Sequence, residues 1–94
     1  MQLSFEWDKG KAETNMRKHD ISFSEAQTVF TDGLSIMILD PDHSDDEERW
    51  IIMGMSLNNR LLAVIFTERN HHIRLISARK VTRGEREEYE HTDS

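Results

Sequence analysis

The chain of 94 residues contains no cysteine, a single proline and no apolar run long enough to cross a membrane. Without cysteine it has no disulfide framework, no thiolate nucleophile and none of the usual zinc sites. The longest apolar run, Leu61 to Phe66, has the length of a strand, whereas a membrane span needs about 20 apolar residues. Residues 1–7 lack the basic and apolar regions of a secretory signal. We expect a cytoplasmic protein of one domain, 1–94, with a disordered tail from about residue 90.

Basic residues are fewer than acidic ones, which gives a formal net charge of −6. This balance argues against a general nucleic-acid-binding protein. The charges are segregated, however: residues 60–86 carry seven basic and two acidic side chains, whereas 1–59 carry a net −7 and 87–94 a net −4. The segregation has two interpretations, an ordinary charged surface or a local cationic site on an acidic protein.

The first strong local signal is an amphipathic stretch over residues 9–19, which predicts a helix. Asp8 stands where its carboxylate can accept from the first-turn N–H groups, and Asp20 stands where helices commonly end in a left-handed residue. We expect Ala12 and Met16, four residues apart, to form the face of this helix that packs on the core.

A second helix is predicted over 23–30, because Ser22 and Glu25 have the spacing of a capping box, in which each side chain bonds to the other residue's N–H group. The remaining segments are expected to be strands at Leu3–Trp7, Leu34–Leu39, Arg49–Ser56, Leu61–Thr67 and His72–Lys80, and a helix over Thr82–Tyr89. This order predicts an α+β fold: a short N-terminal strand, two helices on one face, a four-stranded antiparallel meander and a C-terminal helix.

Arginine dominates the basic segment, and four arginines lie at or near predicted strand ends: Arg60, Arg69, Arg74 and Arg79. A guanidinium group stays charged and can hold phosphate oxygens in two-point contact, so such a cluster could bind a scissile phosphate. The alternative is a set of exposed arginines paired with the acidic surface. Strict alternation along the strand over 72–80 puts Arg79 on the face of Leu75, and Arg74 on the face of Ala78.

His19 and Tyr89 are the candidates for proton transfer, and Glu48 is a further candidate base. Each has a structural alternative. His19 would suit the negative end of its helix, and Tyr89 could pack the last helix on the sheet or stack on a base. His71 and His72 are expected to be exposed residues of a turn.

The acidic run 40–48 is not a calcium loop, because Asp45 stands where glycine is required and Ile51 where a bidentate glutamate is required. A loose magnesium contact, a solvated loop and a docking surface for a basic partner remain as interpretations. We predict no metal site and no cofactor.

Many short motifs in this sequence, in this order, resemble those of the BrnT family. They are Phe5-Glu6-Trp7-Asp8, Lys11, Asn15, Lys18-His19, Ser22 to Ala26, Val29-Phe30, His43-Ser44, Glu47-Glu48-Arg49, Gly54, Ser56, Arg60, Thr67, Arg69 and Ile73 to Arg79. The resemblance extends from Phe5 to about Tyr89. The sequence departs from the family pattern at Asp20, where the family usually has glycine, and in its net acidity.

The resemblance implies a fold similar to that of RelE-type ribonuclease toxins, and an endoribonuclease that cuts RNA without a metal. It also implies a BrnA-type antitoxin with a ribbon-helix-helix part as the partner. The protein would contact DNA only through this antitoxin. A heterotetramer of toxin and antitoxin is one assembly that we consider. The alternative is an antitoxin-binding module with little or no activity. The residues predicted to be catalytic are Arg79, Arg69, Arg74, His19 and Tyr89, and those predicted to bind RNA are Arg60, Lys80, Lys18 and Lys11.

Overall fold

The computed structural model describes residues 3–42 and 47–91. Its elements, in chain order, are β1 (Phe5–Trp7), α1 (Lys9–His19), α2 (Phe23–Ala26), the 3₁₀ helix η1 (Gln27–Thr31), β2 (Ile36–Leu39), β3 (Trp50–Met55), β4 (Leu61–Arg69), β5 (His72–Lys80) and α3 (Arg83–His91). The predicted α+β class and element order are confirmed. The second predicted helix is divided into α2 and η1, and α3 continues past Tyr89 to His91.

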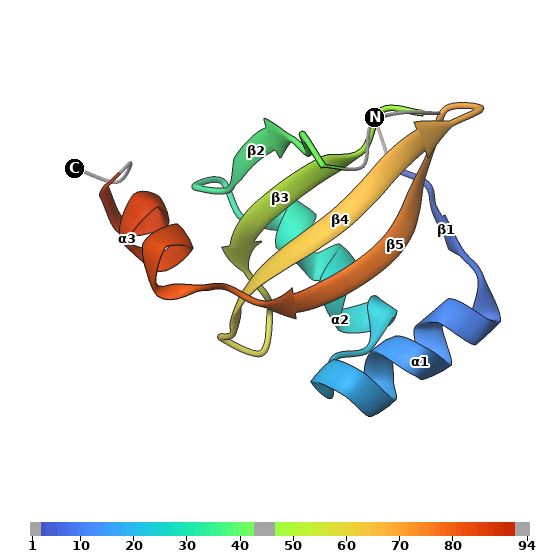
Figure 1. Cartoon of the computed structure of the whole chain (residues 1–94), viewed down its shortest axis with the longest axis horizontal. Coiled ribbons are helices and arrows are strands. Elements are labelled where there is room, and N and C mark those ends of the chain that lie inside the picture. The colour runs from blue at the N-terminus through green and yellow to red at the C-terminus, as the bar shows by residue number, and fades with distance from the viewer. Residues whose placement is uncertain (1–2, 43–46, 92–94) are drawn as a thin grey trace.

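The strands form one five-stranded sheet in the order β1-β5-β4-β3-β2 (Figure 1). Strands β2 to β5 form the predicted antiparallel meander. The apolar strand β4 is the central strand of the five-stranded sheet. Strand β1 pairs in parallel with β5 over Phe5–Trp7 only, opposite Ile73–Leu75. The second half of β5 therefore continues beyond the last residue that β1 covers.

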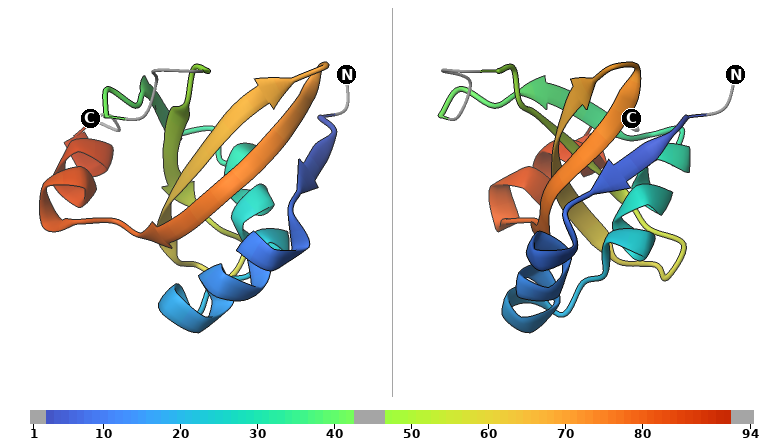
Figure 2. Two further views of the ribbon diagram at one scale, coloured as in Figure 1. Left: turned by 45° about the vertical axis from the view of Figure 1, so that its right-hand side comes forward. Right: turned by 90° about the vertical axis from the view of Figure 1, so that its right-hand side faces the viewer.

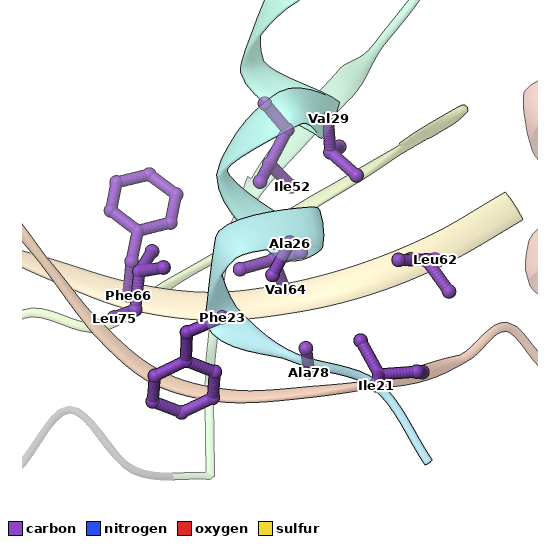
Figure 3. Close-up of a cluster of buried hydrophobic side chains, with 10 residues drawn as sticks. All are labelled: Ile21, Phe23, Ala26, Val29, Ile52, Leu62, Val64, Phe66, Leu75 and Ala78. Atoms are coloured by element: carbon purple, nitrogen blue, oxygen red, sulfur yellow. The ribbon is translucent and has the colours of Figure 1, made fainter. Parts of the chain in front are cut away.

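The core lies between one face of the sheet and the pair α2 and η1. Phe23, Ala26 and Val29 point from these helices onto β4 and its neighbours (Figure 3). The whole cluster consists of Ile21, Phe23, Ala26, Val29, Ile52, Leu62, Val64, Phe66, Leu75 and Ala78. Helix α3 lies on the opposite side of the sheet from α2 and η1 (Figure 2). We call the side under α2 and η1 the core face and the other side the arginine face.

Each predicted helix start has the expected cap. The Asp8 carboxylate accepts from Lys11 N at 2.9 Å, and Ser22 Oγ accepts from Glu25 N at 3.0 Å. Asp20 adopts the left-handed conformation, with φ of 58°. Glycine adopts this conformation most easily, which would explain the glycine usual at this position in the family that the sequence resembles. The Glu25 carboxylate makes a different contact from the one predicted, because it bonds to Ser56 and Arg60.

A bulge in β5 overturns the predicted alternation of this strand. Ile65 is opposite Ser77, but the next residue, Phe66, is opposite Leu75, so Ile76 is an extra residue in β5. An extra residue reverses the alternation beyond it. Arg79 is therefore not on the face of Leu75.

As a consequence of the bulge, all three predicted catalytic arginines lie on one face of the sheet. Cross-strand partners lie on the same side of a sheet. Arg69, Arg74 and Arg79 are thus grouped with Thr67 and Ala63 on the arginine face, while Leu75 and Ala78 both enter the core.

Helix α1 packs through a different residue from the one predicted. Ala12 packs against the core, but Met16 is 44% exposed and the buried residue is Asn15, at 4%. Asn15 Nδ2 donates to the Ile21 carbonyl at 3.0 Å, and its Oδ1 accepts from Ala78 N at 2.9 Å. A polar side chain is tolerated here because both of its ends are bonded.

No helix within the described residues is long and apolar enough to span a bilayer.

Replacing Asn15 by alanine is expected to lower the free energy of unfolding by about 2–4 kcal/mol, because two buried hydrogen bonds are lost and their partners are left unsatisfied. Met16→Ala, on the same helix, should cost roughly 0.5 kcal/mol. Urea unfolding of the two variants measures the difference. A larger loss for Met16→Ala would restore the predicted packing face.

Candidate functional site

The three arginines of the arginine face form a row along the β4–β5 ladder. Arg69 is opposite His72, and Arg79 is opposite Ala63, six residues away along β4. At about 3.3 Å per residue the two ends of the row are some 20 Å apart. Arg69 and Arg79 therefore cannot grip a single phosphate group from backbone positions this far apart. The row has the geometry to meet successive phosphates instead.

Each arginine of the row is paired with a carboxylate, as the alternative interpretation predicted. Arg69 contacts Glu47 at 3.0 Å, Arg74 contacts Glu6 at 2.9 Å and Arg79 contacts Glu85 at 2.8 Å, in each case nitrogen to oxygen. The Arg79–Glu85 contact is two-pronged, through both terminal guanidinium nitrogens. The hydrogen bonds between them raise the pKa of Arg79 and lower that of Glu85, so both groups remain charged near neutral pH.

Glu85 has a second role at the start of α3. Its Oε1 accepts from Thr82 N at 2.8 Å, and its own N–H donates to Thr82 Oγ1 at 3.2 Å. Thr82 and Glu85 therefore form a capping box at the start of α3. Arg79 is consequently attached, through Glu85, to the first turn of α3.

A groove between α1 and β5 brings together three of the other predicted residues. Its volume is about 490 Å³, and it is lined by Asp8, Gly10, Lys11, Thr14, Asn15, Lys18, His19, Ile76 and Ser77. Lys11, Lys18 and His19 thus share one concave surface, which we call the α1 groove. Strand β5 supplies the other wall, at the bulge.

The position of the α1 groove follows from the short pairing of β1. Beyond Leu75 the edge of β5 has no strand beside it, and Asn15 of α1 bonds the free Ala78 N–H there. The groove reaches Ser77, which lies on the arginine face between Arg74 and Arg79 in the register. Ser77 therefore belongs both to the lining of the α1 groove and to the arginine face.

Arg60 belongs to a different part of the structure. Its Nε and Nη2 donate to the Glu25 carboxylate, and Nη2 also donates to the Asp20 carbonyl at 3.0 Å. Glu25 is buried, and Ser56 Oγ donates to it at 2.7 Å. The bond from Arg60 outweighs burial and lowers the pKa of Glu25 to about 2. Arg60 thus joins the end of α1, the start of α2 and the β3–β4 turn.

Lys80 lies with Arg60 rather than with the row of arginines. Both line a hollow of about 340 Å³ at the end of the sheet, together with Asn59, Leu61, Val81 and Arg86. Lys80 is opposite Leu62 on the core face, one residue from Arg79 on the other face.

Helix α3, which carries Tyr89, lies at the far side of the sheet from α1 (Figure 1). The Tyr89 hydroxyl donates to Asp32 Oδ2 at 2.6 Å, and the same oxygen accepts from Met55 N at 2.8 Å. Burial would raise the pKa of Asp32, but these bonds and one from Leu34 N outweigh it and lower the pKa. This contact attaches α3 to the loop before β2, so the geometry favours the packing interpretation of Tyr89.

The acidic run 40–48 lies partly outside the described residues, because 43–46 are not included in them. Among the residues that are described, no group of three or more histidine, aspartate or glutamate side chains could hold a metal ion. Glu48 lines a hollow with Thr67 and Glu68, and its carbonyl accepts from Thr67 Oγ1 at 2.7 Å.

Sequence reasoning missed three residues that shape the site. Ser77 lies both in the lining of the α1 groove and on the arginine face. Glu85 forms an ion pair with Arg79, and Glu6 forms one with Arg74. A signal existed for Glu85, since Thr82 and Glu85 have capping-box spacing and Arg79 immediately precedes that motif. Nothing in the local pattern identifies Ser77 or Glu6, because their partners are distant in sequence or depend on the bulge.

The comparisons place this fold among the ribonuclease toxins of type II toxin–antitoxin systems. The family model described as the ribonuclease toxin BrnT of a type II toxin–antitoxin system matches residues 7–85. The chain belongs to the BrnT family, as the ordered motifs predicted. Membership of a toxin–antitoxin family implies an antitoxin partner.

A solved structure supports the fold independently. The chain is similar to the crystal structure of the Brucella abortus ribonuclease toxin BrnT, with a TM-score of 0.63 and 22% sequence identity over 87% of this chain and 100% of that one. At this identity the likeness shows the fold. No curated protein matches the sequence.

The buried Glu25–Arg60 pair predicts an acid-sensitive fold. Because the pKa of Glu25 is about 2 in the folded chain and near 4.5 ordinarily, the pair contributes stability above pH 4.5 and loses it as the pH falls towards 2. Glu25→Gln should flatten the decline in unfolding free energy over that range. Glu13→Gln, at an exposed position of α1, is the matched control. Equal slopes for the parent and Glu25→Gln would contradict this account.

Proposed function

We propose that the chain is a metal-independent endoribonuclease that cleaves RNA by attack of a ribose 2′-hydroxyl on the adjacent phosphate. The observation that supports it best concerns Ser77, which lines the groove that holds His19 and lies on the sheet face that holds Arg74 and Arg79. An acid–base group and cations are what phosphate transfer without a metal requires.

In this mechanism His19 takes the proton of the 2′-hydroxyl as that oxygen forms a bond to phosphorus. The bond from phosphorus to the 5′-oxygen breaks, and the leaving oxygen takes a proton from water or from the protonated imidazole. The products are a 2′,3′-cyclic phosphate and a 5′-hydroxyl. Arg79 and Arg74 stabilise the charge that develops on the phosphate oxygens. The contact of Tyr89 with Asp32 favours His19 over Tyr89 for the proton transfer.

In this proposal Arg79 binds RNA by exchanging Glu85 for a phosphate group. Both are two-point, charge-assisted contacts, so the exchange replaces one strong acceptor by another. In the proposal Glu85 keeps the bonds to Thr82, at the start of α3, that it makes in this structure. Lys11 and Lys18 of the α1 groove would hold neighbouring phosphates and offset the acidity of the rest of the chain.

The partner in this proposal is a BrnA-like antitoxin with a ribbon-helix-helix part, which carries the contact with DNA and joins two toxins into a heterotetramer. The cytoplasm, where RNA and antitoxin meet, is the expected location. A second candidate, an antitoxin-binding module of low activity, is favoured by one observation: all three arginines of the row are already paired with carboxylates.

Purified, antitoxin-free protein is expected to cut single-stranded RNA in EDTA and to leave 2′,3′-cyclic phosphate ends. An oligonucleotide with one 2′-deoxyribose at the cleaved position should resist at that position only, because the attacking group is missing. Gel analysis with end labelling measures both. Intact RNA at high protein concentration would favour the binding module, and cleavage that EDTA abolishes would show a metal requirement.

Arg79→Ala should abolish growth arrest on expression and lower the cleavage rate by roughly 100-fold or more, because a cation at the phosphate is lost. Arg79→Lys should recover only part of the rate, since an ammonium group cannot make the two-point contact. Arg17→Ala, an exposed arginine of α1, is the control for charge. A folded Arg79→Ala variant with the parent's rate would exclude this residue from the site.

A further inference from the structure

The cations of the chain are not all neutralised in the same way. In the row on the arginine face every guanidinium has a carboxylate within about 3 Å. The hollow at the end of the sheet differs, since Arg60, Lys80 and Arg86 line it and no carboxylate does. Three cations and no carboxylate therefore line this hollow beside the row, and Glu25 and Glu90 pair with Arg60 and Arg86 from outside it.

The three cations differ in how firmly they are held. Arg60 is fixed by Glu25 and the Asp20 carbonyl through Nε and Nη2, and no described residue accepts from its Nη1. Lys80 is exposed and forms no ion pair with a described carboxylate. Arg86 is 53% exposed, and Glu90 stands 4.0 Å from its Nη1, at the limit of an ion pair. One preorganised cation and two accessible ones suit an anion that arrives from solution.

The hollow is also correctly placed to extend the proposed cleavage site. Lys80 follows Arg79 directly in β5, and the alternation of a strand places their side chains on opposite faces of the same strand end. A single strand of RNA whose scissile phosphate lies beside Ser77 and Arg79 would pass this strand end. Its next phosphates would then meet Lys80 and Arg86.

We propose that Arg60, Lys80 and Arg86 form a second phosphate subsite, which holds an RNA phosphodiester flanking the cleaved one. This inference rests on the proposed ribonuclease function and adds the direction in which the RNA continues. Lys80 and Arg86 supply the affinity, whereas Arg60 also stabilises the fold. An acidic segment of the antitoxin is the competing occupant, and RNA is favoured because the hollow adjoins Arg79.

The test uses the full chain and a short single-stranded RNA whose 2′-hydroxyls are methylated, so that binding is measured without cleavage. Lys80→Ala with Arg86→Ala should weaken binding severalfold and make the slope of log affinity against log salt shallower by roughly 1 to 1.5, since two phosphate contacts are lost. Lys9→Ala with Arg83→Ala removes two exposed cations outside the hollow and should leave the slope nearly unchanged. Thermal unfolding verifies that both double variants fold.

Each outcome decides the matter. Equal weakening by the two double variants would reduce the effect to overall charge and overturn the subsite. Unchanged RNA binding with weakened antitoxin binding would assign the hollow to the antitoxin instead. If the parent cleaves RNA and the Lys80→Ala, Arg86→Ala variant binds RNA as tightly as the parent, the subsite is wrong and the ribonuclease proposal stands. If the double variant binds RNA more weakly but the parent never cleaves RNA, the subsite stands and the ribonuclease proposal is wrong. A parent that does not bind this RNA overturns the subsite.

Discussion

The side-chain amide of Asn15 holds the site together. It joins α1 to the start of the chain segment leading into α2, through the Ile21 carbonyl, and to the edge of β5, through Ala78 N. Strand β1 ends before it reaches this part of β5, so Asn15 takes the place of a neighbouring strand. The amide donates through its nitrogen and accepts through its oxygen, and these two bonds fix the position of α1 along β5. The position of α1 in turn places His19 and Lys18 in the groove.

The bulge at Ile76 is the second constraint, and it acts on the other wall of the same groove. By adding one residue to β5 it allows Leu75 and Ala78 to enter the core together. The same shift puts Arg79 on the face of Arg74. This one bulge thus lets two residues of β5 enter the core and places two arginines on the same face. Bulges frequently occur beside functional sites.

The sequence predicted the elements well where their ends carry specific chemistry. The caps at Asp8 and Ser22 located two helix starts, and the apolar run from Leu61 located the central strand. It failed where the answer depends on a tertiary contact. Met16 is apolar and has helical spacing, yet α1 packs through Asn15, because the polar edge of β5 requires a partner.

The sequence named candidate residues for the site but not their arrangement. Arg69, Arg74 and Arg79 share one face of the sheet, and His19, Lys11 and Lys18 share a groove, but alternation in β5 gave the wrong face for Arg79. The carboxylates that occupy the row are distant from it in sequence, as Glu6 is from Arg74, or are visible only as a helix cap, as Glu85 is. In the proposed function, pairing of this kind reconciles an acidic chain with RNA binding, because phosphates replace the carboxylates.

That exchange is the central claim, and a crystal structure of the chain with a 2′-O-methylated RNA tests it most directly. The account predicts a phosphate beside Ser77 in contact with Arg79, with Glu85 released from Arg79 and still bonded to Thr82. RNA bound elsewhere, with the Arg79–Glu85 pair intact, would contradict it.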